Sequence, residues 1–192
     1  MSFEYPYLDD LHLHVADRIS EDDAARQERT AREILSRLRN QPGVVLADEV
    51  GMGKTFVALA VAASVIAAER EGRPVVVMVP PSLIEKWPRD FKVFKKKCLA
   101  PSLSPDILSR FREGRADSAV EFLKLLDDPV DSRKLIIFLT HGAMSRGISD
   151  DWVKVALIQR ALRSRKDIAD IHRGLHRFMG DIVYGMKKIQ RA

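Results

Sequence analysis

The residues with the clearest chemical potential form a short glycine-rich segment, Gly51-Met52-Gly53-Lys54-Thr55. A polyphosphate carries several negatively charged oxygens, so it needs a cluster of backbone N–H donors that no side chain blocks. Glycine at positions 51 and 53 permits that close approach and the unusual backbone angles that it demands. A helix beginning near Thr55 would direct its unpaired N–H groups and the positive end of its dipole to the same point. The segment therefore predicts a phosphate-binding loop.

Two side chains of this loop predict the rest of a nucleotide and metal site. Lys54 would neutralise the β and γ phosphate oxygens, and the Thr55 hydroxyl would ligate Mg²⁺. The strict phosphate-loop motif has a glycine where this chain has Asp48. The alternative interpretation is a glycine turn beside an exposed lysine. We expect the nucleotide to be held by Gly51, Met52, Gly53, Lys54 and Thr55, with Thr55 as the metal ligand.

The stretches around this loop indicate an α/β architecture. The run Gly43–Ala47 is apolar, β-branched at its centre and bounded by a turn, as is typical of a buried strand. Val75–Val79 and Leu135–Thr140 repeat this signature. Capping signals and helical spacing predict helices over about 21–39, 55–70, 82–94 and 117–126, and residues 95–116 read mainly as loop. The alternation predicts a parallel sheet with crossover helices.

Length and composition limit the class of protein. The chain has 192 residues, 46% hydrophobic and 31% charged, which suits about one globular domain and argues against disordered, collagen-like and membrane classes. Its single cysteine, Cys98, excludes a disulfide framework and a thiolate zinc cluster, and favours a reducing compartment. No leader is visible at the start, and the longest apolar run, 56–68, is too short to cross a bilayer. We therefore expect a cytoplasmic protein with no membrane partner.

The charge is unevenly distributed along the chain. Residues 153–192 hold ten Lys or Arg and three acids, a net charge of +7, whereas residues 1–152 carry −2. A basic end permits a polyanionic partner, and a solvated basic helix face is the alternative. Helical spacing continues from residue 151 onward. We expect an N-terminal extension at 1–19, a nucleotide-binding lobe at 20–150 and a basic helical segment at 151–192.

Three blocks of the sequence share a recognisable order. The first, Leu46–Thr55, has an Asp-Glu pair before Gly-x-Gly-Lys-Thr. The second, Val77–Phe91, is a strand followed by Pro-x-Ser-Leu and a helix that bears a tryptophan. The third, Leu135–His141, is an apolar strand that ends in threonine. The blocks resemble motifs I, Ia and Ib of the Swi/Snf-type DNA translocases in helicase superfamily II, where the Asp-Glu pair accounts for Asp48. The resemblance covers about residues 20–145.

The resemblance implies the P-loop NTPase fold, as a RecA-like lobe that binds ATP with Mg²⁺ and contacts the backbone of double-stranded DNA. The family places a glutamine one helix upstream of the loop to read the adenine edge, and Gln27 matches that place. Arg26 stands where the family has an aromatic residue, and a surface glutamine is the alternative. DNA contacts are implied for Ser82, Lys86, Thr140 and His141. For Ser82 the alternative is helix capping, since Ser82 and Glu85 fit a capping box.

The acids needed for hydrolysis are not found at the expected place. A phosphate-loop enzyme needs an Asp at the end of a second strand and a Glu that positions water. After the motif Ia block no apolar run ends in Asp-Glu; Asp127-Asp128 follows a helix, and Asp150-Asp151 lacks a preceding strand. No residues remain for a second RecA-like lobe either. We therefore expect an incomplete RecA-like lobe, the N-terminal part of a translocase, that binds ATP and DNA without hydrolysing ATP alone.

This expectation includes partners and leaves two other functions open. The partner would be the missing remainder of the motor or another polypeptide. The first alternative is a non-catalytic module that binds nucleic acid or a partner while its P-loop is vestigial. The second is a different class of P-loop ATPase, active when a partner supplies the acidic residues.

Overall fold

The computed structural model describes residues 4–9, 11–16, 18–47, 51–99 and 103–145. The chain divides into two units, residues 1–145 and 146–192, and all the described residues belong to the first. The helices expected from residue 151 onward lie outside the described residues.

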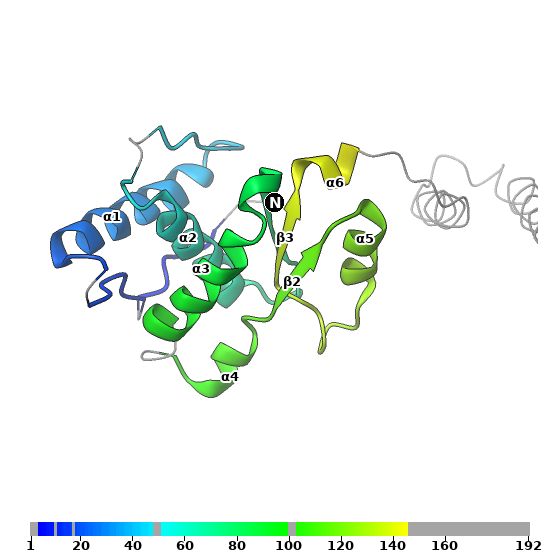
Figure 1. Cartoon of the computed structure of the whole chain (residues 1–192). Helices are drawn as coiled ribbons and strands as arrows, with labels where there is room; N and C mark the ends of the chain where they lie inside the picture. Colours follow the sequence, from blue (N-terminus) through cyan, green and yellow to red (C-terminus); the bar gives the residue numbers. More distant parts are fainter. Residues whose placement is uncertain (1–3, 10, 17, 48–50, 100–102, 146–192) are drawn as a thin grey trace, which may run out of the picture. The chain divides into compact units, whose positions relative to one another are not determined.

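A three-stranded parallel sheet forms the centre of the first unit (Figure 1). Its strands are β1 (Val75–Val79), β2 (Glu113–Ala116) and β3 (Ile136–Thr140), in the order β1-β3-β2. Val75 and Glu113 both pair with Ile136, so the three strands start at the same edge. The central strand β3 is buried from Ile136 to Leu139. The expected α/β fold with a parallel sheet is confirmed.

Helices cover the two faces of the sheet unequally. Figure 1 shows α1 (Glu21–Leu38), α2 (Lys54–Ala68) and α3 (Lys86–Phe94) on one side, and α5 (Ala119–Asp127) on the other. The larger core lies on the side of α1 to α3, and a smaller one lies beneath α5. Four short helical segments complete the unit: η1 (Pro81–Leu83), η2 (Lys95–Leu99), α4 (Pro105–Ser109) and α6 (His141–Ser145).

The alternation of side chains along β1 explains which surface stays open. Val75, Val77 and Val79 face the larger core. Val76 and Met78 share the opposite face with Ile137 and Leu139 of β3, because paired residues of parallel strands point to the same side. Helix α5 packs against residues of β2 and β3 on this face, and Val76 and Met78 remain 39% and 48% exposed.

The predicted strand at Gly43–Ala47 is wrong. These residues have no regular secondary structure, and Val45 is 90% exposed. A strand satisfies its backbone N–H and C=O groups only through a neighbouring strand, and this run pairs with none of the strands in the described ranges. The converse error concerns β2. This strand lies inside the stretch 95–116, for which the sequence predicts mainly loop.

The described N-terminal residues pack onto the lobe. Leu11, Leu13 and Val15 are buried in the larger core, and the Leu13 amide donates to Glu28 Oε1 of α1 at 2.9 Å. The Tyr5 hydroxyl donates to Glu69 Oε2, also at 2.9 Å. None of the described helices is long and apolar enough to cross a membrane.

Candidate functional site

The glycine-rich loop ends in a sharp backbone turn that starts α2. Gly51 has a φ of 93° and Gly53 a φ of 79°, in the left-handed region that glycine adopts at little cost. The Gly53 carbonyl accepts the first hydrogen bonds of the helix, from the Phe56 amide at 2.9 Å and the Val57 amide at 3.2 Å. No side chain caps α2, and its first turn has no acid. The positive end of this helix is therefore not compensated by a carboxylate of its own first turn.

Gln27 of α1 lies directly against this turn. Its side chain is 3% exposed, so the alternative of a surface glutamine is wrong. A Cβ on Gly53 would lie 2.2 Å from Gln27 Nε2, which means that only glycine fits at position 53 while Gln27 stays in place. Gln27 Oε1 is buried and has no hydrogen-bond partner among the described residues. A buried carbonyl oxygen without a donor is costly, and a ligand amine would remove that cost.

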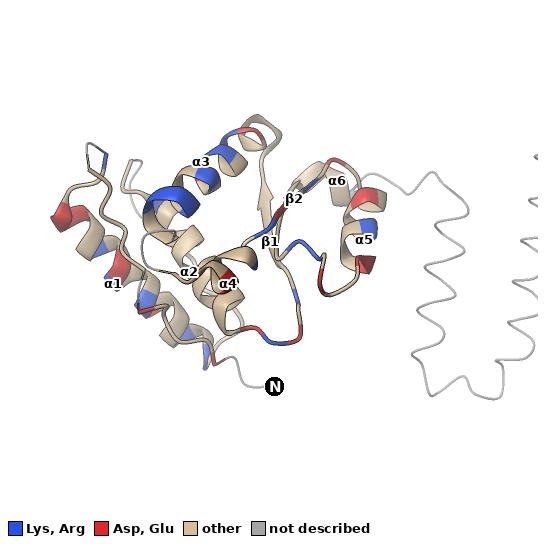
Figure 2. Cartoon of the chain, turned by 90° about the horizontal axis from the view of Figure 1, so that it is seen from below, with Lys and Arg blue, Asp and Glu red and all other residues tan. Residues whose placement is uncertain are grey.

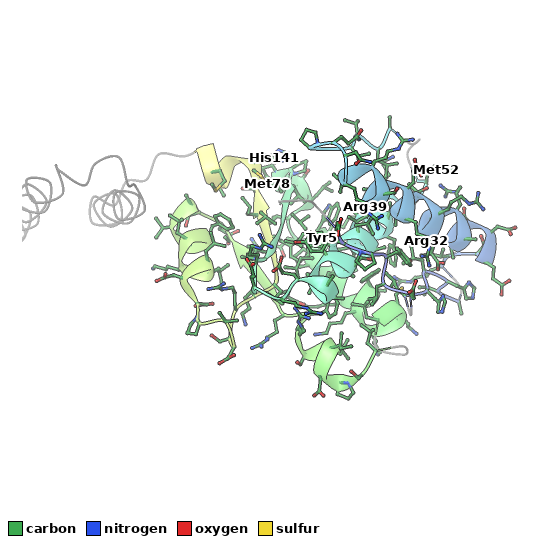
Figure 3. The ribbon with its side chains drawn as sticks, turned by 180° about the vertical axis from the view of Figure 1, so that it is seen from behind. Tyr5, Arg32, Arg39, Met52, Met78 and His141 are labelled. Atoms are coloured by element: carbon green, nitrogen blue, oxygen red, sulfur yellow. The ribbon has the colours of Figure 1, made fainter. Side chains whose placement is uncertain are left out.

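Arg26, the residue before Gln27, ties α1 to the loop. Its Nη2 donates to the Met52 carbonyl at 3.1 Å and to Asp23 Oδ1 at 3.2 Å. Hydrogen bonds from Ser20 and Arg26 lower the pKa of Asp23. Figure 3 shows Met52 beside α1. The sequence did not indicate this contact of Arg26. Its only signal was that Arg26 stands where the family pattern has an aromatic residue.

A small hollow separates α1 from the start of α2. It has a volume of about 220 Å³, and its lining includes Gln27, Gly51, Gly53 and Phe56. Small-molecule sites usually measure about 300–1,000 Å³, so this hollow would hold one part of a nucleotide, such as the base, and leave the rest outside.

The metal-binding expectation falls on Thr55, the second residue of α2. Thr55 is half-buried. In the part of the chain that the structure describes, no three His, Cys, Asp or Glu residues gather closely enough to hold a metal ion. Mg²⁺ is commonly bound by few protein ligands together with phosphate oxygens and water. A single hydroxyl such as that of Thr55 suits Mg²⁺ that arrives with a nucleotide, and its role as a metal ligand stays a prediction.

The residues expected to contact DNA gather at the carboxyl edge of the sheet. Val79 pairs with Thr140, so the segments that follow β1 and β3 emerge side by side. Ser82 and His141 are both exposed there. Figure 3 shows Met78 and His141 close together at this edge, in a different part of the unit from Met52. The structure thus brings Ser82, Thr140 and His141 to one edge of the sheet.

The local chemistry at this edge differs from the expectation in two respects. Ser82 does not cap a helix: Pro80 and Pro81 introduce a 3-10 turn, and α3 begins only at Lys86. The prediction that Ser82 stands at a helix N-terminus is therefore wrong. Thr140 Oγ1 accepts the Ala143 amide at 3.2 Å and so stabilises the first turn of α6.

Lys86 already has an acidic neighbour. Its Nζ lies 2.8 Å from Asp90 Oδ2, one turn along α3. This exposed i,i+4 pair is worth about 0.3–0.5 kcal/mol, so a phosphate could compete for the lysine at little cost.

One carboxylate follows a strand directly in the described residues. Asp117 comes after β2, but its Oδ1 accepts from Arg115 Nε at 2.9 Å and it does not line the hollow beside Gly53. β2 is separated from β1 by β3. The Asp127-Asp128 pair ends α5, as the sequence indicated. None of these acids provides the second-strand carboxylate of a phosphate-loop ATPase.

The glycine turn before α2, the parallel sheet and the buried glutamine together define part of a RecA-like lobe. The SNF2-related domain family matches residues 26–159, more than half of the chain. The chain belongs to this family, and the match covers the region of the N-terminal ATPase lobe. Searches of curated proteins and of solved structures gave no match. The ATPases of this family use ATP with Mg²⁺ and act on DNA.

Proposed function

We propose that this domain binds ATP with Mg²⁺ at the start of α2. The observation that carries the proposal is Gln27, whose orphaned Oε1 is buried against Gly53 beside an uncapped helix N-terminus. The backbone around Gly51 to Lys54 would hold the phosphates, because glycine leaves the amides accessible. Lys54 would neutralise the terminal phosphates, and Thr55 would ligate Mg²⁺.

Gln27 gives the proposed site its base preference. Its free Oε1 can accept a hydrogen bond from an amine, such as the exocyclic amine of adenine, and Nε2 can donate to a ring nitrogen. Guanine has a carbonyl where adenine has that amine. The site should therefore favour ATP over GTP.

Calorimetry with ATP–Mg²⁺ tests the nucleotide site. Lys54→Ala should lower affinity by at least about tenfold, since one charge-assisted contact is worth about 1.5–3 kcal/mol. Lys124→Ala, which removes an exposed lysine from α5, is the matched control and should leave affinity unchanged. Gln27→Ala should reduce the preference for ATP over GTP. Equal ATP affinity in Lys54→Ala and the original chain would remove the site from the proposal.

The proposal places DNA at the carboxyl edge of the sheet. Ser82 and His141 are exposed there, and Lys86 adds a positive charge that a phosphate can share. The double variant Ser82→Ala/His141→Ala should weaken binding of a labelled DNA duplex by several-fold in fluorescence anisotropy. Ser104→Ala/His14→Ala removes the same two residue types from other exposed positions and serves as the control. An equal loss in both variants would argue against this edge.

We also propose that the chain does not hydrolyse ATP alone. The described strands supply no acid to the hollow beside Gly53, so hydrolysis would require carboxylates from a further segment or a partner polypeptide. Steady phosphate release by the purified chain, absent from Lys54→Ala prepared in the same way, would refute this part.

A second function is favoured by the loss of the expected strand before the P-loop. Gly43–Ala47 lies outside the sheet, so no strand anchors the P-loop from this side. The lack of such an anchor is what we expect of a vestigial P-loop. The domain would then bind nucleic acid or a partner through its basic segment. DNA binding that persists without ATP and disappears on removal of residues 153–192 would favour this function, whereas ATP binding sensitive to Lys54→Ala would exclude it.

A further inference from the structure

A second hollow, which we name the arginine hollow, lies at the amino edge of the sheet. It has a volume of about 440 Å³ and is lined by parts of three loops, each of which leads into a different strand. Arg70 precedes β1, Arg110 and Arg112 precede β2, and Arg133 precedes β3. Figure 2, which views the unit from below, shows basic residues on the loops at this edge.

The arginine hollow is separate from the P-loop. The P-loop adjoins the start of α2, whereas Arg70 follows the end of that helix. Fifteen helical residues at 1.5 Å each give a separation of about 22 Å along the helix axis. Ser82 and His141 lie at the carboxyl edge of the sheet, so they do not reach the hollow either.

Two of its arginines are held in place without losing their charge. Arg110 donates to the Ala67 carbonyl at 3.0 Å and to the Glu69 carbonyl. Arg133 donates to the Asp128 carbonyl at 3.0 and 3.1 Å and to the Gly72 carbonyl at 3.2 Å. These acceptors are neutral, so they orient the guanidinium groups and leave the positive charges in place.

The nearby acids do not cancel this charge. Asp131 is the single acid among the lining residues, against four arginines. The Glu69 carboxylate is buried and bonded to Tyr5 and Arg73, and Glu71 also pairs with Arg73. The lining therefore keeps a net charge of +3, because four positive side chains face one negative one.

The other two arginines are available to a ligand. Arg70 and Arg112 are exposed, and their side chains make no hydrogen bond or ion pair with the described residues. A structural role accounts for Arg110 and Arg133 but not for this pair. The planar guanidinium fork matches two phosphate oxygens at once, which makes arginine clusters suited to phosphate. We propose that the arginine hollow binds phosphate groups, carried either by a free polyphosphate or by a nucleic-acid backbone.

Amide chemical shifts of the ¹⁵N-labelled full chain test this site directly. Gly72 lines the hollow, and Gly53 reports separately on the P-loop. Inorganic pyrophosphate, added at constant ionic strength, should shift the Gly72 amide with saturation. A shift at Gly53 concerns the nucleotide proposal alone, so the two proposals can fail independently.

Charge-matched variants decide the outcome. Arg70→Gln/Arg112→Gln should weaken pyrophosphate binding at Gly72 by about tenfold or more, while Arg29→Gln/Arg39→Gln removes two exposed arginines from the α1 region and should not. A short DNA duplex is the second probe. A saturable shift of the Gly72 amide with pyrophosphate would identify the ligand of the hollow as a free polyphosphate. A shift of this amide with the duplex alone would identify the ligand as a nucleic-acid backbone. The proposal is overturned if neither probe shifts Gly72, or if the shift persists in Arg70→Gln/Arg112→Gln.

Discussion

Replacing Gly53 with alanine should destabilise the domain through its contact with Gln27. An alanine at a φ of 79° costs about 1–2 kcal/mol, because the left-handed conformation brings Cβ close to the carbonyl oxygen. The new Cβ would also lie 2.2 Å from Gln27 Nε2 and 2.7 Å from Gln27 Cδ, too close for either atom to stay in place. Overpacking of this kind costs about 1–3 kcal/mol. The adjacent hollow of about 220 Å³ offers the amide some room, which favours the lower half of that range.

Gly51→Ala is the matched control for this prediction. Gly51 has a φ of 93°, but a Cβ there would meet nothing within 4 Å. It should therefore cost only the conformational part, about 1–2 kcal/mol. The total for Gly53→Ala should be about 2–4 kcal/mol, the sum of the conformational and packing costs. In the Gln27→Ala background the packing part should disappear, so that alanine at position 53 then costs about as much as alanine at position 51.

Urea denaturation of the four variants and the original chain measures these free energies. The double-mutant cycle for positions 27 and 53 isolates the pair, since contacting residues show interaction energies of about 0.5–3 kcal/mol. Equal destabilisation by Gly53→Ala and Gly51→Ala would refute the contact. A cycle that is additive within error would do the same, and the placement of Gln27 against the P-loop would be withdrawn.

Three further predictions concern the reactivity of Cys98, the pKa of Glu69 and the packing of the two sheet strands β1 and β3. Cys98 is 1% exposed and burial raises its pKa to about 12, so Ellman's reagent should label the native chain at pH 8 at least about 100-fold more slowly than the unfolded chain; fast native labelling would contradict its burial. Burial alone would raise the pKa of Glu69, but hydrogen bonds from the Glu71 amide, a tyrosine and an arginine outweigh it and lower the pKa below 4.5. The stabilisation that Glu69 provides is thus present above about pH 4.5 and lost as the pH falls through the lower folded pKa, and Glu69→Gln should reduce the acid sensitivity of the urea midpoint. Phe138→Ala, at a fully buried position of β3, should cost about 3–5 kcal/mol. Met78→Ala, on the half-exposed face of β1, should cost less than about 1 kcal/mol in the same denaturation assay.

Four elements with strong local signals were predicted correctly. Helix α1 starts where Ser20 accepts the Asp23 amide, as the capping signal indicated. The apolar runs of β1 and β3 form strands, and α2 follows the glycine turn. For α1 and α2 the decisive interactions are local, and for β1 and β3 the β-branched, apolar composition of the run indicates a strand.

The side-chain contacts of the candidate site could not be predicted from the sequence. The family pattern indicated Gln27, but not that its Oε1 is buried without a partner or that its amide excludes a Cβ from Gly53. The Arg26 contact with the Met52 carbonyl joins residues 26 positions apart. Such contacts depend on how α1 packs against the loop, which no local pattern encodes.

The amino-acid sequence is sufficient to predict the glycine turn, the helix that follows it, two of the strands and the family. Which other segments form strands depends on how the elements pack together. Glu113–Ala116 is polar and short, yet it forms β2 because the free edge of β3 offers backbone partners from Ile136 to Leu139. Gly43–Ala47 has the apolar composition of a strand, yet it pairs with none of the described strands and remains irregular. The arginine hollow arises in the same way, since parallel strands bring the loops before them to one edge and place the arginines of distant segments together.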